Sequence, residues 1–167
     1  LQGGGLYHQY RASEEERRRR EALDAELRRV LAPYLRPDYQ AFSRNQLLTM
    51  AAPAMSAIRA QTAQAMRDVA ESFAARGLTG SSLEASALTN AVARGATSAS
   101  QLWQQLVTAN AGLTEQMRQW ATNLLAQQAM NAQQAQAAAQ SYLASLAAEI
   151  SKLIAAYVAA QNLGQTA

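Results

Sequence analysis

The most regular feature of the chain is a row of small and apolar side chains that recurs every three or four residues between positions 88 and 124. This spacing keeps the row on one side of an α-helix. The row, termed here the 88–124 stripe, contains Leu88, Val92, Gly95, Ala99, Leu102, Leu106, Ala109, Leu113, Met117, Trp120 and Leu124. It predicts a long helix. Because little chain remains to cover it, we expect it to pack against other helices, including copies of the same chain.

The same spacing returns near the end of the chain, in an amphipathic segment over 142–160. Its apolar row consists of Leu143, Leu146, Ile150, Leu153 and Tyr157. The segment is close to membrane-spanning length, but Glu149 and Lys152 at its centre argue against a permanent transmembrane helix. An amphipathic helix that enters bilayers as part of an assembly stays open, and the five apolar residues are its candidate membrane contacts.

The rest of the chain divides at its glycines and prolines. Residues 1–12 read as a flexible Gly-rich segment, and 13–39 as a short charged helix followed by a corner rich in proline and tyrosine. A second helix, with apolar side chains along one side, is expected over 40–76. The long helix then runs over 82–163, and Asn110-Ala111-Gly112 is the place where we expect it to bend or break.

A sharp turn over 77–81 separates the two longer helices. Gly77 suits the left-handed position that follows a helix, and Ser81 with Glu84 three residues later has capping-box spacing. The residues that we expect to form this turn are Gly77, Thr79, Gly80, Ser81 and Glu84. A connection this short between two long helices predicts an antiparallel helical hairpin.

Composition supports an all-α fold. Strong helix formers dominate, the three prolines lie in the first third of the chain, and no segment alternates as a half-buried strand does. Much of the apolar fraction is alanine, which buries little area per residue. We therefore predict an elongated hairpin of long Ala/Gln-rich helices that assembles as a helical bundle or ring.

Residue chemistry gives no candidate catalytic, metal-binding or cofactor-binding residues. The chain has no cysteine and one histidine, and its carboxylates lie on an arginine-rich helix or stand alone. The net charge of +3 comes almost entirely from arginine. In the charged helix the arginines are nearly balanced by glutamate and aspartate at i,i+4 spacing, so any contact with DNA would be non-specific. We expect no enzyme.

The segment from Arg76 to Leu88 (Arg-Gly-Leu-Thr-Gly-Ser-Ser-Leu-Glu-Ala-Ser-Ala-Leu) resembles a phrase found in structural proteins of tailed bacteriophages. In those proteins a helix ends at an Arg-Gly-Leu-x-Gly-Ser-Ser turn and an Ala/Gln-rich helix follows. The similarity extends over residues 60–140, about half of the chain. It implies an internal virion, ejection or DNA-transfer protein of a short-tailed phage, held in the capsid near the portal or tail.

The resemblance carries further expectations about partners. Other virion proteins, such as the portal and the tail tube or nozzle, are the implied neighbours, together with further copies of this chain. The protein would leave the particle with or before the DNA, contact the host membrane and help to form a channel through the host envelope, with Gly77, Gly80, Gly95 and Gly112 as flexible points. A static head–tail connector or tail-core component is the alternative. A secreted bacterial membrane translocator is a further one.

Overall fold

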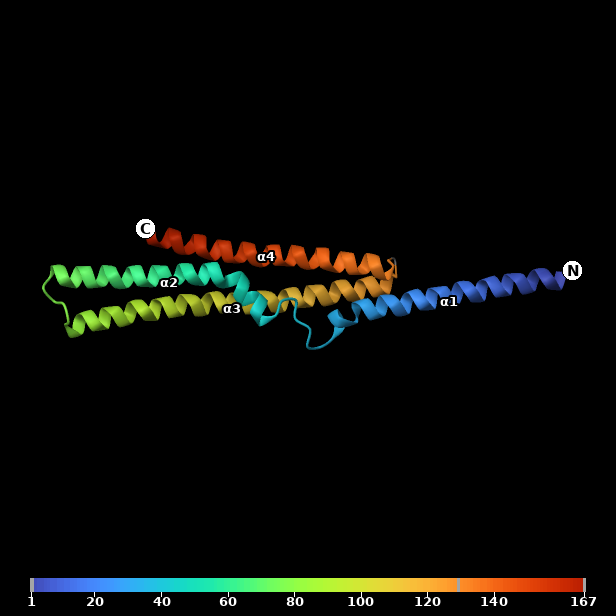
Figure 1. Ribbon diagram of the computed structural model, residues 1–167, viewed down its shortest axis with the longest axis horizontal. Coiled ribbons are helices and arrows are strands. Elements are labelled where there is room, and N and C mark those ends of the chain that lie inside the picture. The colour runs from blue at the N-terminus through green and yellow to red at the C-terminus, as the bar shows by residue number, and fades with distance from the viewer. Residues whose placement is uncertain (1, 129, 167) are drawn as a thin grey trace. The chain divides into compact units, whose positions relative to one another are not determined.

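The computed structural model describes the backbone of residues 2–128 and 130–166 and the side chains of 11–128 and 130–161. Within these residues the chain forms four α-helices and no strand (Figure 1): α1 (Gln2–Leu35), α2 (Arg44–Ala75), α3 (Ser82–Gln127) and α4 (Ala132–Thr166). The all-α prediction is therefore confirmed. The helices contribute to two compact units. Unit 1 comprises Leu1–Ala41 and Gly112–Leu146, and unit 2 comprises Phe42–Ala111 and Ala147–Ala167.

Helix α1 differs from the prediction at both ends. The segment 1–12, expected to be flexible, is helical from Gln2 onward. Extending an existing helix costs less free energy than nucleating a new one, because each added residue gains one hydrogen bond. The helix formed by the charged stretch can therefore extend backwards through the three glycines. At the other end the helix passes Pro33 and stops at Leu35. Arg36 precedes Pro37, and a residue before proline is disfavoured in the helical region.

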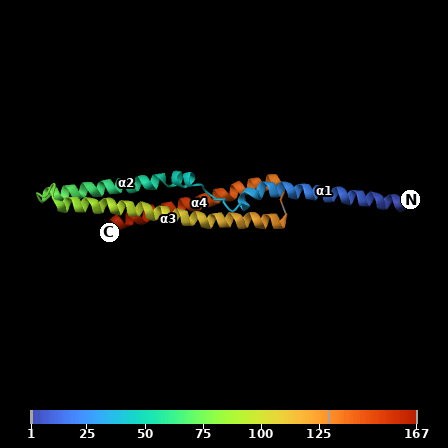
Figure 2. The same cartoon turned by 90° about the horizontal axis from the view of Figure 1, so that it is seen from below.

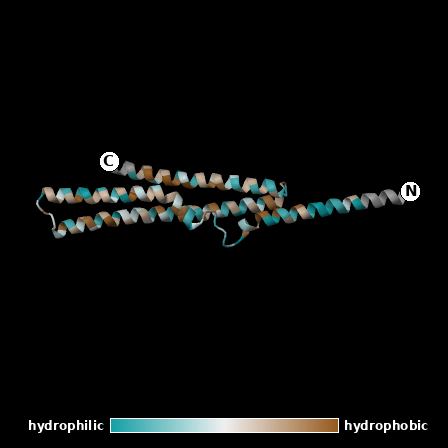
Figure 3. Cartoon of the chain, viewed as in Figure 1, coloured by the Kyte–Doolittle hydropathy of each residue, from teal (hydrophilic) through white to brown (hydrophobic). Residues whose placement is uncertain are grey.

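The charged stretch of α1 is exposed to solvent, and Figure 3 shows its hydrophilic character. Two of its ion pairs have i,i+4 spacing: Arg20 lies 3.2 Å from Glu16, and Arg17 lies 3.9 Å from Glu21. Such exposed pairs contribute little stability because solvent screens them. This stretch behaves as a solvated helix face.

The long helix breaks at a different place from the one predicted. α3 continues through 110–112 without interruption and ends at Gln127. Gln128 has a positive φ of 51°, and Asn131 starts α4 by accepting from Gln134 N at 2.8 Å and donating its own N–H to Gln134 Oε1 at 3.3 Å. This reciprocal capping stops one helix and starts the next. Because alanine and glutamine are strong helix formers, helix propensity alone does not predict this break.

Unit 1 has a small apolar core where α1, α3 and α4 meet. Its buried residues are Leu27, Leu31, Ala121, Leu124 and Ala135. The rings of Trp120 and Tyr142 stack beside this core, with centroids 5.5 Å apart. Leu27 and Leu31 thus anchor the second half of α1 in this core.

The corner that follows α1 also belongs to unit 1 and is held by polar contacts to α3. Ala41 N donates to Thr114 Oγ1 at 2.9 Å, and Arg118 Nη2 donates to the Arg36 carbonyl at 3.2 Å. The Tyr34 and Tyr39 rings meet edge to face at 5.3 Å. Burial raises the pKa of Tyr39 to about 12, and Tyr34 adds to this rise.

Unit 2 begins with two hydrogen bonds between the Asn110 side chain and the Phe42 backbone, which are together termed here the clasp. Phe42 N donates to Asn110 Oδ1 at 3.1 Å, and Asn110 Nδ2 donates to Phe42 O at 2.9 Å. Both residues are buried, so the asparagine amide satisfies two backbone groups that would otherwise lack partners. Ser43 then starts α2 through a complete capping box with Gln46. The amide of Asn110, expected to weaken α3, instead ties it to the start of α2.

Further along unit 2, α2 and α3 lie side by side and run in opposite directions, as Figures 1 and 2 both show. The two helices approach closely at Gly95. A Cβ added there would collide with the Thr62 hydroxyl and would lie 3.1 Å from both Thr62 Cβ and Cγ2. Gly95, expected as a flexible point, therefore serves close packing. Gly112 has open space around it.

The Asn110→Ala substitution should lower the free energy of unfolding by about 1–3 kcal/mol, because it leaves the buried Phe42 N–H and carbonyl unsatisfied. Urea denaturation measures the change. Asn123→Ala, an exposed position of the same helix, controls for helix propensity and should leave stability unchanged or slightly higher. Equal effects of the two substitutions would contradict a structural role for the clasp.

The Gly95→Ala substitution should destabilise the fold by about 1–3 kcal/mol through overpacking against Thr62. Gly112→Ala should instead stabilise it by about 0.5–1 kcal/mol, since it only gains helix propensity. Thermal and urea unfolding test both. In a Thr62→Ala background most of the Gly95→Ala loss should disappear, and its persistence there would contradict the assigned collision.

Stability should also fall as the pH rises from about 10 to about 12. The folded state holds the Tyr39 proton more tightly than the unfolded chain, whose tyrosine has a pKa near 10, so this contribution is complete below pH 10 and is lost above it. Ultraviolet titration of tyrosinate should reveal a late-titrating group that Tyr39→Phe removes. If the variant instead lost a tyrosine that titrates near pH 10 and kept the late-titrating group, the assignment would be refuted.

Candidate docking groove

An apolar groove lies between α2 and α3 in unit 2. It has a volume of about 610 Å³. The residues that line it are Leu48, Met55, Ile58, Arg59, Thr62, Ala63, Met66, Val92, Gly95, Ala96 and Ala99. Its α3 side consists of Val92, a glycine and two alanines, and its α2 side carries longer apolar side chains. This combination leaves a hollow because small residues on one helix face larger ones on the other.

Two large apolar side chains of the groove are open to solvent: Leu48 is 43% exposed and Val92 is 47% exposed. A single exposed leucine or valine is ordinary, but apolar residues gathered around one hollow mark a surface that gains stability when it is covered. Full burial of an exposed leucine or valine contributes about 1.5–3 kcal/mol, so covering the exposed part of each of these two side chains contributes roughly half of that. The groove is therefore the strongest candidate for binding on the described surface of unit 2.

Arg59 is the one charged residue among those that line the groove. Its neighbours along the same side of α2 are Met55, Ala63 and Met66, at spacings of three and four residues. Among the described residues Arg59 has no ion pair. An occupant that covers the groove would need to supply an anionic or acceptor group here, because an unpaired cation is costly to desolvate.

The shape of the groove suits a helix. Its α2 side extends from Leu48 to Met66, a span on the order of 27 Å at 1.5 Å rise per residue. Apolar grooves of this kind accept one side of an amphipathic helix. Among the described side chains, no group of three or more His, Cys, Asp or Glu residues comes together to hold a metal ion. The groove thus offers an apolar surface for binding.

The 88–124 stripe is divided by the structure into covered and open parts. Five members are buried by the chain's own helices: Leu102, Leu106, Leu113, Met117 and Leu124. Leu88, Gly95, Ala99, Ala109 and Trp120 are half-buried, and Val92 is exposed while neighbouring Ala91 is buried. The stripe therefore packs against other helices of the same chain over much of its length, and its packing against further copies stays a prediction. Only the part beside the groove lacks cover within the chain.

The candidate membrane contacts of α4 point into the protein. Leu146, Ile150 and Tyr157 are buried, and Leu143 and Leu153 are half-buried. In unit 2, Tyr157 Oη donates to the Ser98 carbonyl of α3 at 2.7 Å, which fixes this side of α4 inward. The segment Ala132–Gln161 of α4 is long and apolar enough to cross a membrane. Their apolar row nonetheless packs on protein in this conformation.

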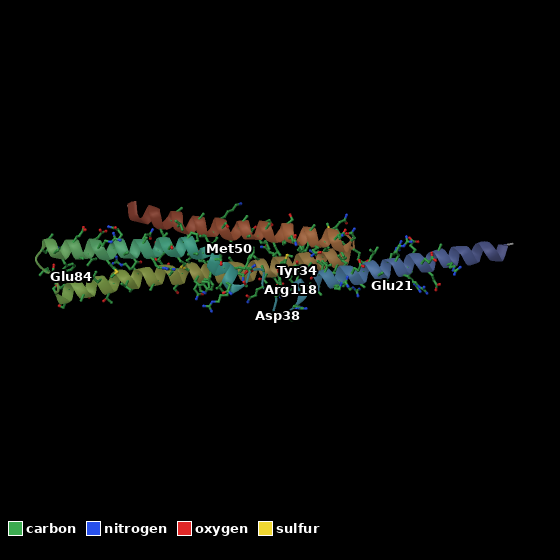
Figure 4. The ribbon with its side chains drawn as sticks, viewed as in Figure 1. Glu21, Tyr34, Asp38, Met50, Glu84 and Arg118 are labelled. Carbon is green, nitrogen blue, oxygen red and sulfur yellow. The ribbon has the colours of Figure 1, made fainter. Side chains whose placement is uncertain are left out.

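The turn residues form a compact connection in unit 2. Gly77 and Gly80 have positive φ values of 73° and 81°, and Leu78 N and Gly77 N donate to the carbonyls of Phe73 and Ala74, as in a Schellman motif. Ser81 Oγ accepts from Glu84 N at 3.2 Å, and Glu84 Oε2 accepts from Gly80 N at 3.2 Å; Figure 4 marks Glu84 at this turn. Hydrogen bonds within the turn and its flanking helices therefore satisfy the backbone N–H groups of Gly77, Leu78, Gly80 and Glu84. Thr79 is exposed.

Sequence reasoning placed Val92, Gly95 and Ala99 of the groove on one helix face and expected an apolar side on α2, but it missed Arg59. The signal was present: Arg59 follows Met55 by four residues and precedes Ala63 by four, so it belongs to the apolar side of its helix. A charge on the apolar side of a helix is worth noting even where the remaining pattern is regular. Comparison of the chain with known protein families, with curated proteins and with solved structures finds no match.

Proposed function

We propose that this chain is a self-associating structural subunit, and that it works in the virion of a tailed phage near the portal and tail. The observation that carries the self-association is the uncovered groove between α2 and α3, with Leu48 and Val92 at 43% and 47% exposure. Covering such a surface with further helices is favourable and needs no reacting group. An elongated hairpin of α2 and α3 that assembles into a bundle or ring is the architecture we propose.

The phage assignment is supported by the resemblance of the turn and its flanks. The glycine positions of that phrase are those that take positive φ here, Gly77 and Gly80, and the serine that follows caps α3. An Ala/Gln-rich helix of 46 residues follows the turn. The resemblance thus agrees with local geometry over residues 76–88 and supports the proposal there.

The proposed role is that of an internal protein ejected with or before the DNA, which helps to form a channel through the host envelope. The apolar row of α4 supports this role, because Leu143, Leu146, Ile150, Leu153 and Tyr157 would meet lipid if α4 left α3. The short connection around Gln128, whose φ is 51°, is where such a movement would pivot. Release would exchange protein contacts for lipid contacts at small net cost in buried apolar area.

A static head–tail connector or tail-core component is the second candidate, favoured by one observation. The apolar row of α4 is already covered by the chain itself, as the Tyr157–Ser98 hydrogen bond illustrates. A component that never meets lipid would keep α4 in this position.

Self-association is tested by analytical ultracentrifugation of the full chain over a wide concentration range. Oligomers that dissociate on dilution are expected, because contact with another copy would bury the exposed apolar surface of the groove. Leu48→Glu should raise the dissociation constant by about tenfold and so shift the population toward monomer, since it places a charge in the apolar contact. Leu83→Glu, at an exposed leucine outside the groove, is the matched control. A monomer at every concentration would refute the proposal.

Ejection is tested on phage particles and on vesicles. Mass spectrometry of particles before and after DNA release should find the chain only before release, and the purified chain should cause leakage from phospholipid vesicles. Retention on emptied particles without leakage at any pH would instead establish the static connector. Absence of the chain from particles would refute the virion assignment altogether.

A further inference from the structure

We infer that α3 and α4 join into one continuous helix when α4 leaves its present position, and that α1 holds the two helices apart until then. The inference rests on the proposed release of α4 and assigns the state that follows it. The residues that hold the break all belong to unit 1: Asp24, Leu27, Leu31, Gln128 and Asn131.

The backbone at the break favours a continuous helix. Gln128 has a φ of 51°, and among the described residues it is the one non-glycine residue with a positive φ. The Cβ of glutamine disfavours this conformation, and glycine or asparagine usually occupies such a position after a helix. Glutamine is in addition a strong helix former, as is the alanine that dominates the sequence on both sides. A helical Gln128 would relieve the unfavourable φ.

Helix α1 bridges the break and keeps it in place. Gln128 Nε2 donates to Asp24 Oδ2 of α1 at 3.3 Å. Leu27 of α1 lies in one buried cluster with Leu124, near the end of α3, and Ala135, near the start of α4. In a joined helix Leu124 and Ala135 would lie about 16 Å apart along the axis, so they could not both belong to this cluster. The contacts of α1 therefore stabilise the broken form.

The buried rows of α3 and α4 would form a single row in the joined helix. Leu124 and Ala135 are eleven positions apart, which is close to three full helical turns. The buried residues that would share one side of the joined helix are Leu113, Met117, Ala121, Leu124, Ala135, Ala139, Leu146, Ile150 and Tyr157. Ile154 would lie at the edge of this side. A helix that folds back needs no such agreement in phase with its predecessor, whereas a joined helix does.

The joined helix would present this row to further copies or to lipid, as the proposed role requires. Joining would also separate groups that now touch. The Trp120 and Tyr142 rings stack at 5.5 Å, and in a joined helix these residues would lie about 33 Å apart along the axis. The distance between the two segments thus distinguishes the broken form from the joined form.

Spin labels measure this distance directly, because the chain has no cysteine of its own. The labels are placed on the full chain at Gln116→Cys and Ala144→Cys, two exposed positions of unit 1. Double electron–electron resonance should give one short distance in buffer. With vesicles of phosphatidylethanolamine and phosphatidylglycerol, a second population should appear near 42 Å, the separation of these positions in a continuous helix at about 1.5 Å per residue.

Substitutions at the break should change the joined population in opposite directions. Gln128→Ala combined with Asn131→Ala removes the cap of α4 and favours the helix, so it should raise the ratio of joined to broken chains by about tenfold. Gln128→Gly should lower that ratio by about tenfold, because glycine accepts the positive φ and weakens a helix. Both positions are exposed, so the apolar contacts remain intact. Gln136→Ala, at an exposed position outside the break, is the control and should have little effect.

One short distance in every variant, with and without vesicles, would overturn the inference. A broad range of long distances that Gln128→Gly leaves unchanged would mean that α4 swings away as a separate helix. That result would overturn the joined helix and leave the proposed release intact. A population near 42 Å in the double alanine variant in buffer, without leakage of vesicles, would support the joined helix and contradict the proposed ejection.

Discussion

Close approach of alanine- and glycine-faced helices is the constraint on which the rest of the structure depends. Alanine buries little area, so contacts built from it stabilise only when helix backbones come near one another over many turns. Gly95 lies so close to Thr62 that even a methyl group at this position would collide with it. A chain packed in this way has little large apolar material to spare. Where large apolar side chains gather around one hollow and remain exposed, as Leu48 and Val92 do, covering that surface would add stability.

Because alanine contributes little burial and no hydrogen bonds, polar side chains fix the connection between α1 and α2 to α3. Asn110 clasps both backbone groups of Phe42, Thr114 receives the N–H of Ala41, and Arg118 reaches the carbonyl of Arg36. Each of these residues belongs to α3, and each fixes the connection between α1 and α2 by satisfying backbone groups that no helix satisfies. The buried amide is the firmest of the three, because its loss would leave two polar groups without partners.

The sequence predicted the helices well where local signals agreed, and less well where side chains act over long distances. The turn after α2 followed from Gly77, Gly80 and the Ser81–Glu84 spacing, all of which act within a few residues. The predicted break at 110–112 was wrong. Asn110 is a poor helix former in isolation, but its side chain bonds to Phe42, 68 positions away, and this contact is not visible in the local sequence. The break at 128–131 carried a local signal, Asn131 followed by Gln134, which glutamine-rich composition masked. For the groove, periodicity found the apolar residues of both helices. It could not tell that α2, α4 and α1 cover most of the stripe, because coverage is a property of the packed chain.

Helix α4 combines two surfaces of different character, and their difference decides what each can do. The inward side carries leucine, isoleucine and tyrosine, which gain about 1.5–3 kcal/mol each from burial and therefore hold α4 on its own chain. The outward side carries alanine and serine together with the exposed Glu149 and Lys152, so covering it would contribute less apolar burial and would desolvate two charges. The inward side therefore decides where α4 lies. Its release would expose leucine, isoleucine and tyrosine to solvent, so α4 stays on its own chain unless another apolar surface takes the place of that contact.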